Sequence, residues 1–467
     1  MDDKVKKAGF KGIVYWISIV ASLGGLLFGL DQGFIANALP TIEKVYTLDI
    51  PGGESFSGIM LWGAAIGTVI AGFSGRYLGR KKSLVLAGSL FVLMSALSAT
   101  LPAYPILYWA RFLLGVGVGI ASFVVPLYLA ETAPAKIRGS MGTLFQLMIT
   151  VGIFAISLTN VLLIRVVSDN VDRLPLMFIV IIIFAVLMLI GAISLPESPR
   201  WLMLRGRKKD AEKVLSRVLN SKEEIDIELN IIEEAINASP KTNRPLKGPF
   251  LKVLLVGIFM MVFQQLVGIN AMIYYAPTIL GYGGIVGFVG MMTVPFVNLL
   301  FTFPAIWLVE KWGRKKLLYI GSVLMLITML AAGFAFLAIG NQTDASLIGS
   351  WPKIILLVSV IIYIFGFAFS WGPVAWLICS EIFPIQNREM GMTITTIVNW
   401  LFAAVVVSFA LTIINSFGPA VLFFIFVVGC VLSIVFLFFW VPETQGVGLE
   451  KIEENLKAGK KLKNIGS

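Results

Sequence analysis

The chain has 467 residues, of which 58% are hydrophobic and only 13% are charged, and its mean hydropathy is +0.91. These values exclude an ordinary soluble globular protein, in which about 25% of residues are charged, and they exclude intrinsic disorder, which requires low hydrophobicity. Histidine is absent, which excludes imidazole metal sites, and the net charge is +11. The composition predicts an all-α polytopic membrane protein without a metal or another cofactor.

Twelve apolar stretches along the chain are each long enough to cross a bilayer as a helix of about 20 residues. They are too long and too uniformly apolar for the strands of a membrane barrel. The first lacks a cleavage pattern and is expected to be a retained span. The stretches are 13–39, 57–74, 83–101, 105–130, 140–164, 175–195, 251–280, 285–309, 317–339, 352–380, 391–415 and 419–441.

The fourth stretch carries Gly115, Gly117 and Gly119, whose spacing predicts close packing of this helix against its neighbours. Cys379 and Cys430 both lie in apolar stretches, where we expect buried free thiols and not a disulfide.

Twelve spans place both ends of the chain on one side of the membrane. If that side is the cytoplasm, the inner segments hold 32 of the 37 lysines and arginines, and the outer loops hold four. The positive-inside rule therefore predicts cytoplasmic termini in a plasma membrane, the inner membrane of a bacterium. It also explains the positive charge without a nucleic-acid partner.

The sequence predicts two six-helix bundles, 1–195 and 251–441, a cytoplasmic linker at 196–250 and a cytoplasmic tail at 442–467. In the linker, apolar residues are spaced as in short amphipathic helices. They are Val214, Leu215, Val218, Leu219, Ile225, Leu229 and Ile232. A regulatory role for this linker stays open as an alternative to a purely structural one.

Three pairs of segments recur in the same order in both bundles. GRYLGRKK at 75–82 matches VEKWGRKK at 309–316, and PESPR at 196–200 matches PET at 442–444. Glu131 and Arg138 have the same spacing as Glu381 and Arg388. The chain is therefore predicted to be a duplicated six-helix unit, whose halves can rock about a site at their interface.

The repeated segments also place acidic and basic residues together at the cytoplasmic ends of both bundles. We expect them to form a latch that is closed when the central site faces outward. Ordinary solvation of loop charges is the alternative, because exposed pairs contribute only about 0–1 kcal/mol each. The residues are Arg80, Glu131, Arg138, Glu197, Arg200, Glu310, Arg314, Glu381, Arg388 and Glu443.

Two charged residues stand out within the spans, and such residues are functional candidates because charge in the membrane is costly. Asp31 lies in the first span and Arg111 in the fourth, both at depths that allow a pair in the outer half. Arginine stays charged, whereas the carboxylate of Asp31 can take up a proton when the pair breaks. The alternative is a static buried ion pair.

Six side-chain amides in four other spans can both donate and accept hydrogen bonds. Together with the rings of Trp376 and Trp400, they predict a cavity for a neutral polyhydroxyl solute. Hydrogen bonds between helices are the alternative use of such amides. The six are Gln146, Gln264, Gln265, Asn270, Asn298 and Asn399.

These motifs together resemble the sugar porters of the major facilitator superfamily, over nearly the whole chain. The resemblance favours bacterial galactose–proton symporters, followed by arabinose– and xylose–proton symporters. The segments that carry it are GGLLFGLDQGFIANALP (24–40), GRKKS (79–83), PLYLAETAPAKIRG (126–139), PESPRWL (196–202), QQLVGINAMIYYAP (264–277), EKWGRKK (310–316), WGPVAWLICSEIFP (371–384) and PETQGVGLE (442–450).

The resemblance implies a role for each matching residue. Asp31 and Arg111 match the proton-coupling pair, Phe28 and Tyr274 match aromatic residues of the cavity, and Tyr275 lies beside an outer gate. Glu310 keeps the acidic residue of a loop motif, whereas Arg76 replaces it in the first half. The implied sugar contacts are Gln146, Gln264, Gln265, Asn270, Asn298, Trp376 and Asn399.

From these observations we expect a monomeric importer of a neutral monosaccharide coupled to a proton, embedded in the lipid bilayer. A sugar facilitator with a static Asp31 and a membrane sugar sensor remain alternatives. An enzyme is not expected, because the spans carry neither a nucleophile–base pair nor a metal constellation.

Overall fold

The computed structural model describes residues 11–132, 138–238, 248–340, 349–384, 387–447 and 449–466. Over these residues the chain is helical and contains no strand. Twelve segments are long and apolar enough to cross a membrane, which confirms the predicted fold class.

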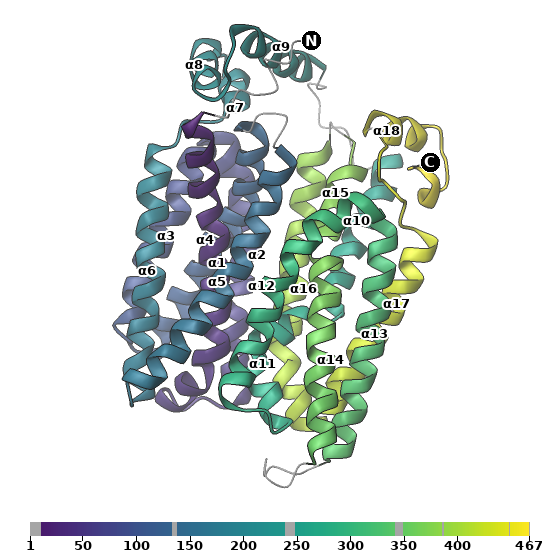
Figure 1. Ribbon diagram of the computed structural model, residues 1–467. Coiled ribbons are helices and arrows are strands. Elements are labelled where there is room, and N and C mark those ends of the chain that lie inside the picture. Colours follow the sequence, from purple (N-terminus) through teal and green to yellow (C-terminus); the bar gives the residue numbers. More distant parts are fainter. Residues whose placement is uncertain are drawn as a thin grey trace.

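The first six spans form one bundle, drawn in purple to blue in Figure 1. Three short helices follow it and cover one end of this bundle, called the linker end below (Figure 1). The spans are α1 (Gly12–Val45), α2 (Ile50–Tyr77), α3 (Arg80–Ala99), α4 (Tyr104–Thr132), α5 (Arg138–Val166) and α6 (Asn170–Ser194), and the short helices are α7 (Pro199–Leu204), α8 (Lys208–Val218) and α9 (Lys222–Ala238).

The second bundle, green to yellow in Figure 1, lies beside the first, and the C-terminal helix α18 is also at the linker end. The opposite end is called the far end. The helices are α10 (Pro249–Leu266), α11 (Ile269–Tyr282), α12 (Gly287–Trp312), α13 (Arg314–Ile339), α14 (Ser350–Phe369), α15 (Trp371–Ile382), α16 (Arg388–Phe417), α17 (Pro419–Phe439), α18 (Leu449–Lys457) and the 3₁₀ turn η2 (Leu462–Asn464).

Two spans of the second bundle are each broken into two helices. The seventh span breaks between α10 and α11 at Gly268, whose φ of +96° suits a residue without a side chain. The tenth breaks between α14 and α15 at Ser370. Breaks at membrane depth expose backbone polar groups and are tolerated where these groups are buried in protein or line a cavity. These two breaks therefore mark the centre of the bundle as a candidate site.

The first two spans are longer than predicted. α1 continues to Val45, beyond the expected end at residue 39, and α2 begins at Ile50, ahead of the expected start at residue 57. The Asp49 carboxylate caps α2 by accepting a hydrogen bond from the backbone N–H of Gly52 at 2.9 Å. Hydropathy indicates membrane depth and not helix ends, so the residues of these extensions fall outside the predicted stretches.

The predicted close packing of the fourth span is confirmed. A Cβ atom on Gly115 would lie 2.0 Å from the carbonyl oxygen of Met60, and one on Gly119 would lie 2.1 Å from that of Ala64, both on α2. Gly117 points elsewhere, and a Cβ there would meet its nearest atoms at 3.4 Å. Two of the three glycines thus allow α4 to contact the backbone of α2.

We predict that Gly115→Ala destabilises the protein by about 1–3 kcal/mol, because the added methyl group forces α2 and α4 apart. Gly117→Ala is the matched control and should be tolerated. The measurement is the thermal midpoint of the purified protein in detergent. Equal midpoints for the two variants would contradict this account of the α2–α4 contact.

Candidate functional site

Asp31 on α1 and Arg111 on α4 form a two-pronged ion pair in the first bundle. Nη1 and Nη2 of Arg111 donate to Oδ1 and Oδ2 of Asp31, each at 3.1 Å, and the two side chains are 1–2% exposed. The Nε of Arg111 donates to the carbonyl oxygen of Phe56 on α2 at 3.0 Å. The sequence predicted that this pair was possible, and the helices bring it together.

A chain of side-chain amides lies next to the breaks in the second bundle. Asn399 Nδ2 donates to Gln264 Oε1 at 2.5 Å, and Gln264 Nε2 donates to the carbonyl oxygen of Trp371 at 2.8 Å. Gln265 Nε2 donates to Gln264 Oε1 at 3.4 Å, and Asn270 Nδ2 donates to Gln265 Oε1 at 2.6 Å. All four amide side chains are buried. This set is called the amide network below.

Gln32 extends the amide network to the first bundle, and sequence reasoning missed it. Its Nε2 donates to Oδ1 of Asn270 at 3.2 Å, from α1 to α11. Gln32 follows Asp31 directly in the chain, so the ion pair and the amide network lie one residue apart. The signal was available in the sequence, because Gln32 is a further amide within the first span.

Aromatic side chains surround this junction between the bundles. The rings of Phe28 on α1 and Trp400 on α16 meet edge to face, with centroids 5.1 Å apart. Tyr274 on α11 is fully buried, beside Gln32 and within electrostatic range of Asp31 and Arg111. Among the described residues, the Tyr274 hydroxyl and the Trp400 Nε1 have no hydrogen-bond partner.

Three other residues predicted to contact a solute lie outside the amide network. Asn298 on α12 is buried, whereas Gln146 on α5 and Trp376 on α15 are partly exposed. Among the described residues, no hydrogen bond joins their side chains to the network. Their predicted role as ligands therefore rests on the sequence.

Contacts between the bundles occur from the middle of the helices to the far end. Phe154 on α5 meets Phe296 on α12 with ring centroids 6.3 Å apart, and Asn160 Nδ2 donates to the sulfur of Met291 at 3.5 Å. α2 packs along α16. Within the second bundle, the Tyr275 hydroxyl donates to the carbonyl oxygen of Val407 on α16 at 2.8 Å. The bundles are thus in contact at the far end.

At the linker end of the first bundle, Arg80 joins two glutamates. Its Nη2 donates to Glu131 Oε1 and its backbone N–H donates to Glu197 Oε1, both at 2.8 Å. The Ser198 hydroxyl donates to the other oxygen of Glu131 at 2.5 Å. A Cβ on Gly79, which has a φ of +97°, would lie 2.2 Å from Glu197 Oε2, so this position requires glycine.

The second bundle repeats this arrangement with equivalent residues. Arg314 Nη2 donates to Glu381 Oε1 at 3.1 Å, and the backbone N–H of Arg314 donates to Glu443 Oε1 at 3.0 Å. The Thr444 hydroxyl donates to Glu381, as Ser198 does to Glu131. The ion pairs Arg80–Glu131 and Arg314–Glu381 therefore each join elements of the same bundle.

The remaining predicted latch residues are Arg200, Arg388, Arg138 and Glu310. Arg200 is exposed on α7, and Arg388 begins α16. The side chains of Arg138 and Glu310 lie outside the described residues.

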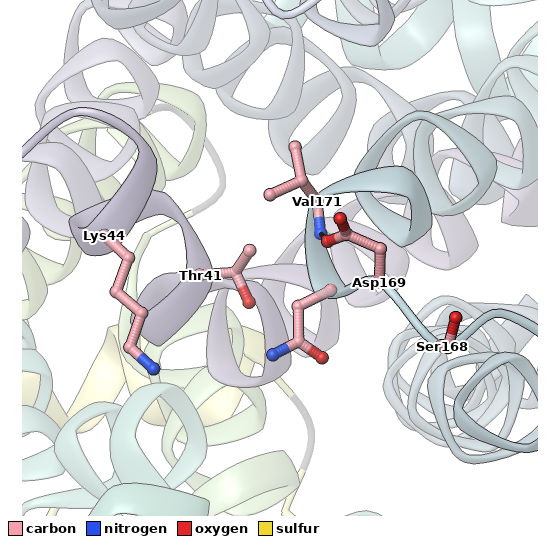
Figure 2. Close-up of a pocket in the computed structure, with 6 residues that line it drawn as sticks. Thr41, Lys44, Ser168, Asp169 and Val171 are labelled. Atoms are coloured by element: carbon pink, nitrogen blue, oxygen red, sulfur yellow. Dashed lines mark hydrogen bonds between the residues drawn. The ribbon is translucent and has the colours of Figure 1, made fainter.

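A surface hollow at the far end lies apart from all of these residues. Figure 2 shows Thr41 and Lys44 near the end of α1, beside Ser168 and Asp169 in the loop before α6 and Val171 in the first turn of α6. All of its lining residues belong to the first bundle. A site that opens to alternate sides needs both bundles, so we assign no transport role to this hollow.

Comparisons with known proteins agree with this architecture. The profile of the family described as "Sugar (and other) transporter" matches residues 17–456. A galactose-proton symporter of Escherichia coli strain K12 is 38% identical over 472 residues, covering 100% of this chain and 99% of the relative. An arabinose-proton symporter of the same strain is 36% identical over 461 residues, covering 97% of this chain and 95% of the relative.

Solved structures agree as well. The xylose transporter XylE from E. coli, in a partially occluded inward open conformation, aligns with a TM-score of 0.80 and 30% identity, over 93% of this chain and 99% of that chain. The resemblance that the sequence motifs indicated is therefore confirmed. The chain belongs to the sugar transporter family of the major facilitator superfamily.

Proposed function

We propose that this protein imports a neutral monosaccharide together with a proton, by alternating access between its two bundles. One observation carries the proposal. The buried Asp31–Arg111 pair lies one residue from Gln32, whose amide bonds the amide network of the opposite bundle. The titratable carboxylate of Asp31 and the uncharged amide network thus lie next to each other, on opposite sides of the interface between the two bundles. In alternating access this is the interface that moves.

The chemistry of the amide network favours a sugar as the solute. Amides donate and accept hydrogen bonds, as sugar hydroxyl groups do. A buried donor without a partner is costly, and sugar hydroxyls would satisfy the Trp400 Nε1 and the Tyr274 hydroxyl. The rings of Phe28, Trp376 and Trp400 would cover the apolar faces of the sugar, and Gln146 and Asn298 would add contacts from α5 and α12.

Relatives support galactose as the sugar, with arabinose and xylose next. The relatives named above are a galactose-proton and an arabinose-proton symporter, and a D-xylose-proton symporter of E. coli K12 is 34% identical over 479 residues. A single contact can discriminate between such sugars in binding, because the presence or absence of one hydroxyl group decides whether a buried polar group of the protein has a hydrogen-bond partner.

Asp31 would carry the proton, and its pairing with Arg111 would determine in which state of the transporter the proton binds. Arginine stays charged in proteins, so Arg111 can compensate only an ionised Asp31. In the paired state the carboxylate accepts two hydrogen bonds from Arg111, which compensate its ionised form. A movement that separates α1 from α4 leaves the carboxylate buried without compensation and favours its protonation. Uptake of sugar and proton would thereby be linked to one movement.

The positive-inside rule assigns the linker end to the cytoplasm of a bacterial cell and the far end to the outside. Contacts between the bundles at the far end then correspond to a state closed to the outside, with Tyr275 at the outer gate. In the opposite state, the charged clusters around Arg80 and Arg314 would meet as a cytoplasmic latch. One chain contains both halves, so a monomer is sufficient.

We expect Asp31→Asn to abolish sugar accumulation driven by a proton gradient, because asparagine cannot exchange a proton. Proteoliposomes with and without an imposed gradient provide the measurement, and the variant should still exchange sugar across the membrane without a gradient. Wild-type protein that never concentrates sugar would identify a facilitator. Binding without any flux would identify a sensor.

Gln264→Ala should weaken sugar binding roughly tenfold to hundredfold, since the loss of a buried hydrogen-bonding group costs about 1–3 kcal/mol. Asn37→Ala is the matched control, because this amide of α1 bonds Ser157 and Asn160 of its own bundle. Calorimetric titration with galactose, glucose, arabinose and xylose ranks the sugars. Unchanged affinity in Gln264→Ala for the preferred sugar would contradict the assigned site.

A further inference from the structure

Glu54 is a buried carboxylate within the span α2 whose hydrogen-bond donors belong to the opposite bundle. Its Oε1 accepts from the backbone N–H groups of Leu411 at 2.5 Å and of Thr412 at 2.9 Å, and its Oε2 accepts from the Thr412 hydroxyl. The residue is 1% exposed. The acceptor is on α2 and both donor residues are on α16, so these bonds exist only while the two helices are in contact.

The surrounding residues allow α16 to approach Glu54 closely. One turn further along α2, a Cβ on Gly58 would lie 2.4 Å from the Ser408 hydroxyl of α16. One turn earlier on α16, the carbonyl oxygen of Val407 accepts the Tyr275 hydroxyl at 2.8 Å. The far end of α16 is therefore held by α11 of its own bundle and offers its N–H groups to α2 of the other.

A buried carboxylate without donors is unfavourable, and hydrogen bonds to charged groups are about twice as strong as neutral ones. Separation of the bundles at the far end would remove all three bonds and expose Glu54 to water. The Glu54 carboxylate therefore keeps its three hydrogen bonds only while the two bundles are in contact at the far end. Backbone N–H groups provide two of the donors, so substitutions of α16 side chains cannot remove them.

We propose that Glu54 is a latch that stabilises the closed state of the far end and thereby sets the balance between the two access states. This inference rests on the alternating access of the proposed function, but it depends neither on the sugar nor on the proton. Within the described part of the chain, no hydrogen bond or ion pair joins Glu54 to the amide network or to the Asp31–Arg111 pair, and it affects them only by changing how closely the two bundles approach each other at the far end.

Spin labels on cysteines at both ends of the molecule test the latch directly, by distance measurements in lipid nanodiscs. Val166 and Val286 are 83% and 67% exposed at the far ends of the two bundles, and Tyr77 and Trp312 are 61% and 47% exposed at the linker end. The native Cys379 and Cys430 are fully buried and should not react with the label.

We expect Glu54→Leu to lengthen the far-end distance and shorten the linker-end distance, since the closed state loses three bonds. The population ratio of closed to open far ends should fall roughly tenfold to hundredfold. Thr412→Val removes only the hydroxyl donor and should give a smaller shift in the same direction. Glu54→Gln keeps an acceptor for the backbone groups and should also give a smaller shift.

Asp49→Asn is the matched control, because it removes a carboxylate from the same end of α2 while keeping a good helix cap. Its distances should equal those of the wild type. Unchanged distances in folded Glu54→Leu would overturn the latch, as would a longer far-end distance without a shorter linker-end distance. If Glu54→Leu does not fold, Glu54→Gln and Thr412→Val decide by the same criterion. Shifted distances without sugar uptake in the wild type would sustain the latch and refute the proposed function.

Discussion

The membrane interior does not tolerate an isolated charge, and this constraint shapes the molecule around Asp31 and Arg111. Each of the two charges would be costly alone, and each is compensated by the other through two hydrogen bonds. The guanidinium also bonds the backbone of α2, so the pair holds α1, α2 and α4 in one arrangement. Under the proposed function, a movement that separates the pair while the carboxylate stays buried favours protonation of Asp31, because Arg111 stays charged.

Charged residues also stabilise each bundle separately at the linker end. Arg80 and Arg314 bind equivalent glutamates within their own bundles, which ties the linker end of each bundle together separately. In the part of the chain that the structure describes, hydrogen bonds between the bundles include that of Gln32 in the middle and those of Glu54 near the far end. A movement that separates the bundles at the far end therefore breaks these bonds and the packing of α2 along α16, and it leaves the Arg80 and Arg314 pairs within the bundles intact.

Much of this arrangement follows from sequence patterns with a physical cause. Hydropathy predicts the twelve spans, the repeated motifs predict the duplication, and the rarity of charge in membranes identifies Asp31 and Arg111. Helix ends and breaks are less predictable, because a helix can extend beyond the apolar segment. Glu54 lies outside the predicted stretch 57–74, although it belongs to the second turn of α2. Gln32 was overlooked beside a charged residue, and its bond to Asn270 depends on the break at Gly268, which hydropathy does not reveal.

The coupling of sugar and proton is the central claim, and the pH of the medium around unenergised proteoliposomes tests it most directly. Addition of the preferred sugar to the outside should make a weakly buffered medium more alkaline as protons enter with the sugar, and a protonophore should abolish the change. Sugar entry at a constant external pH would contradict the account.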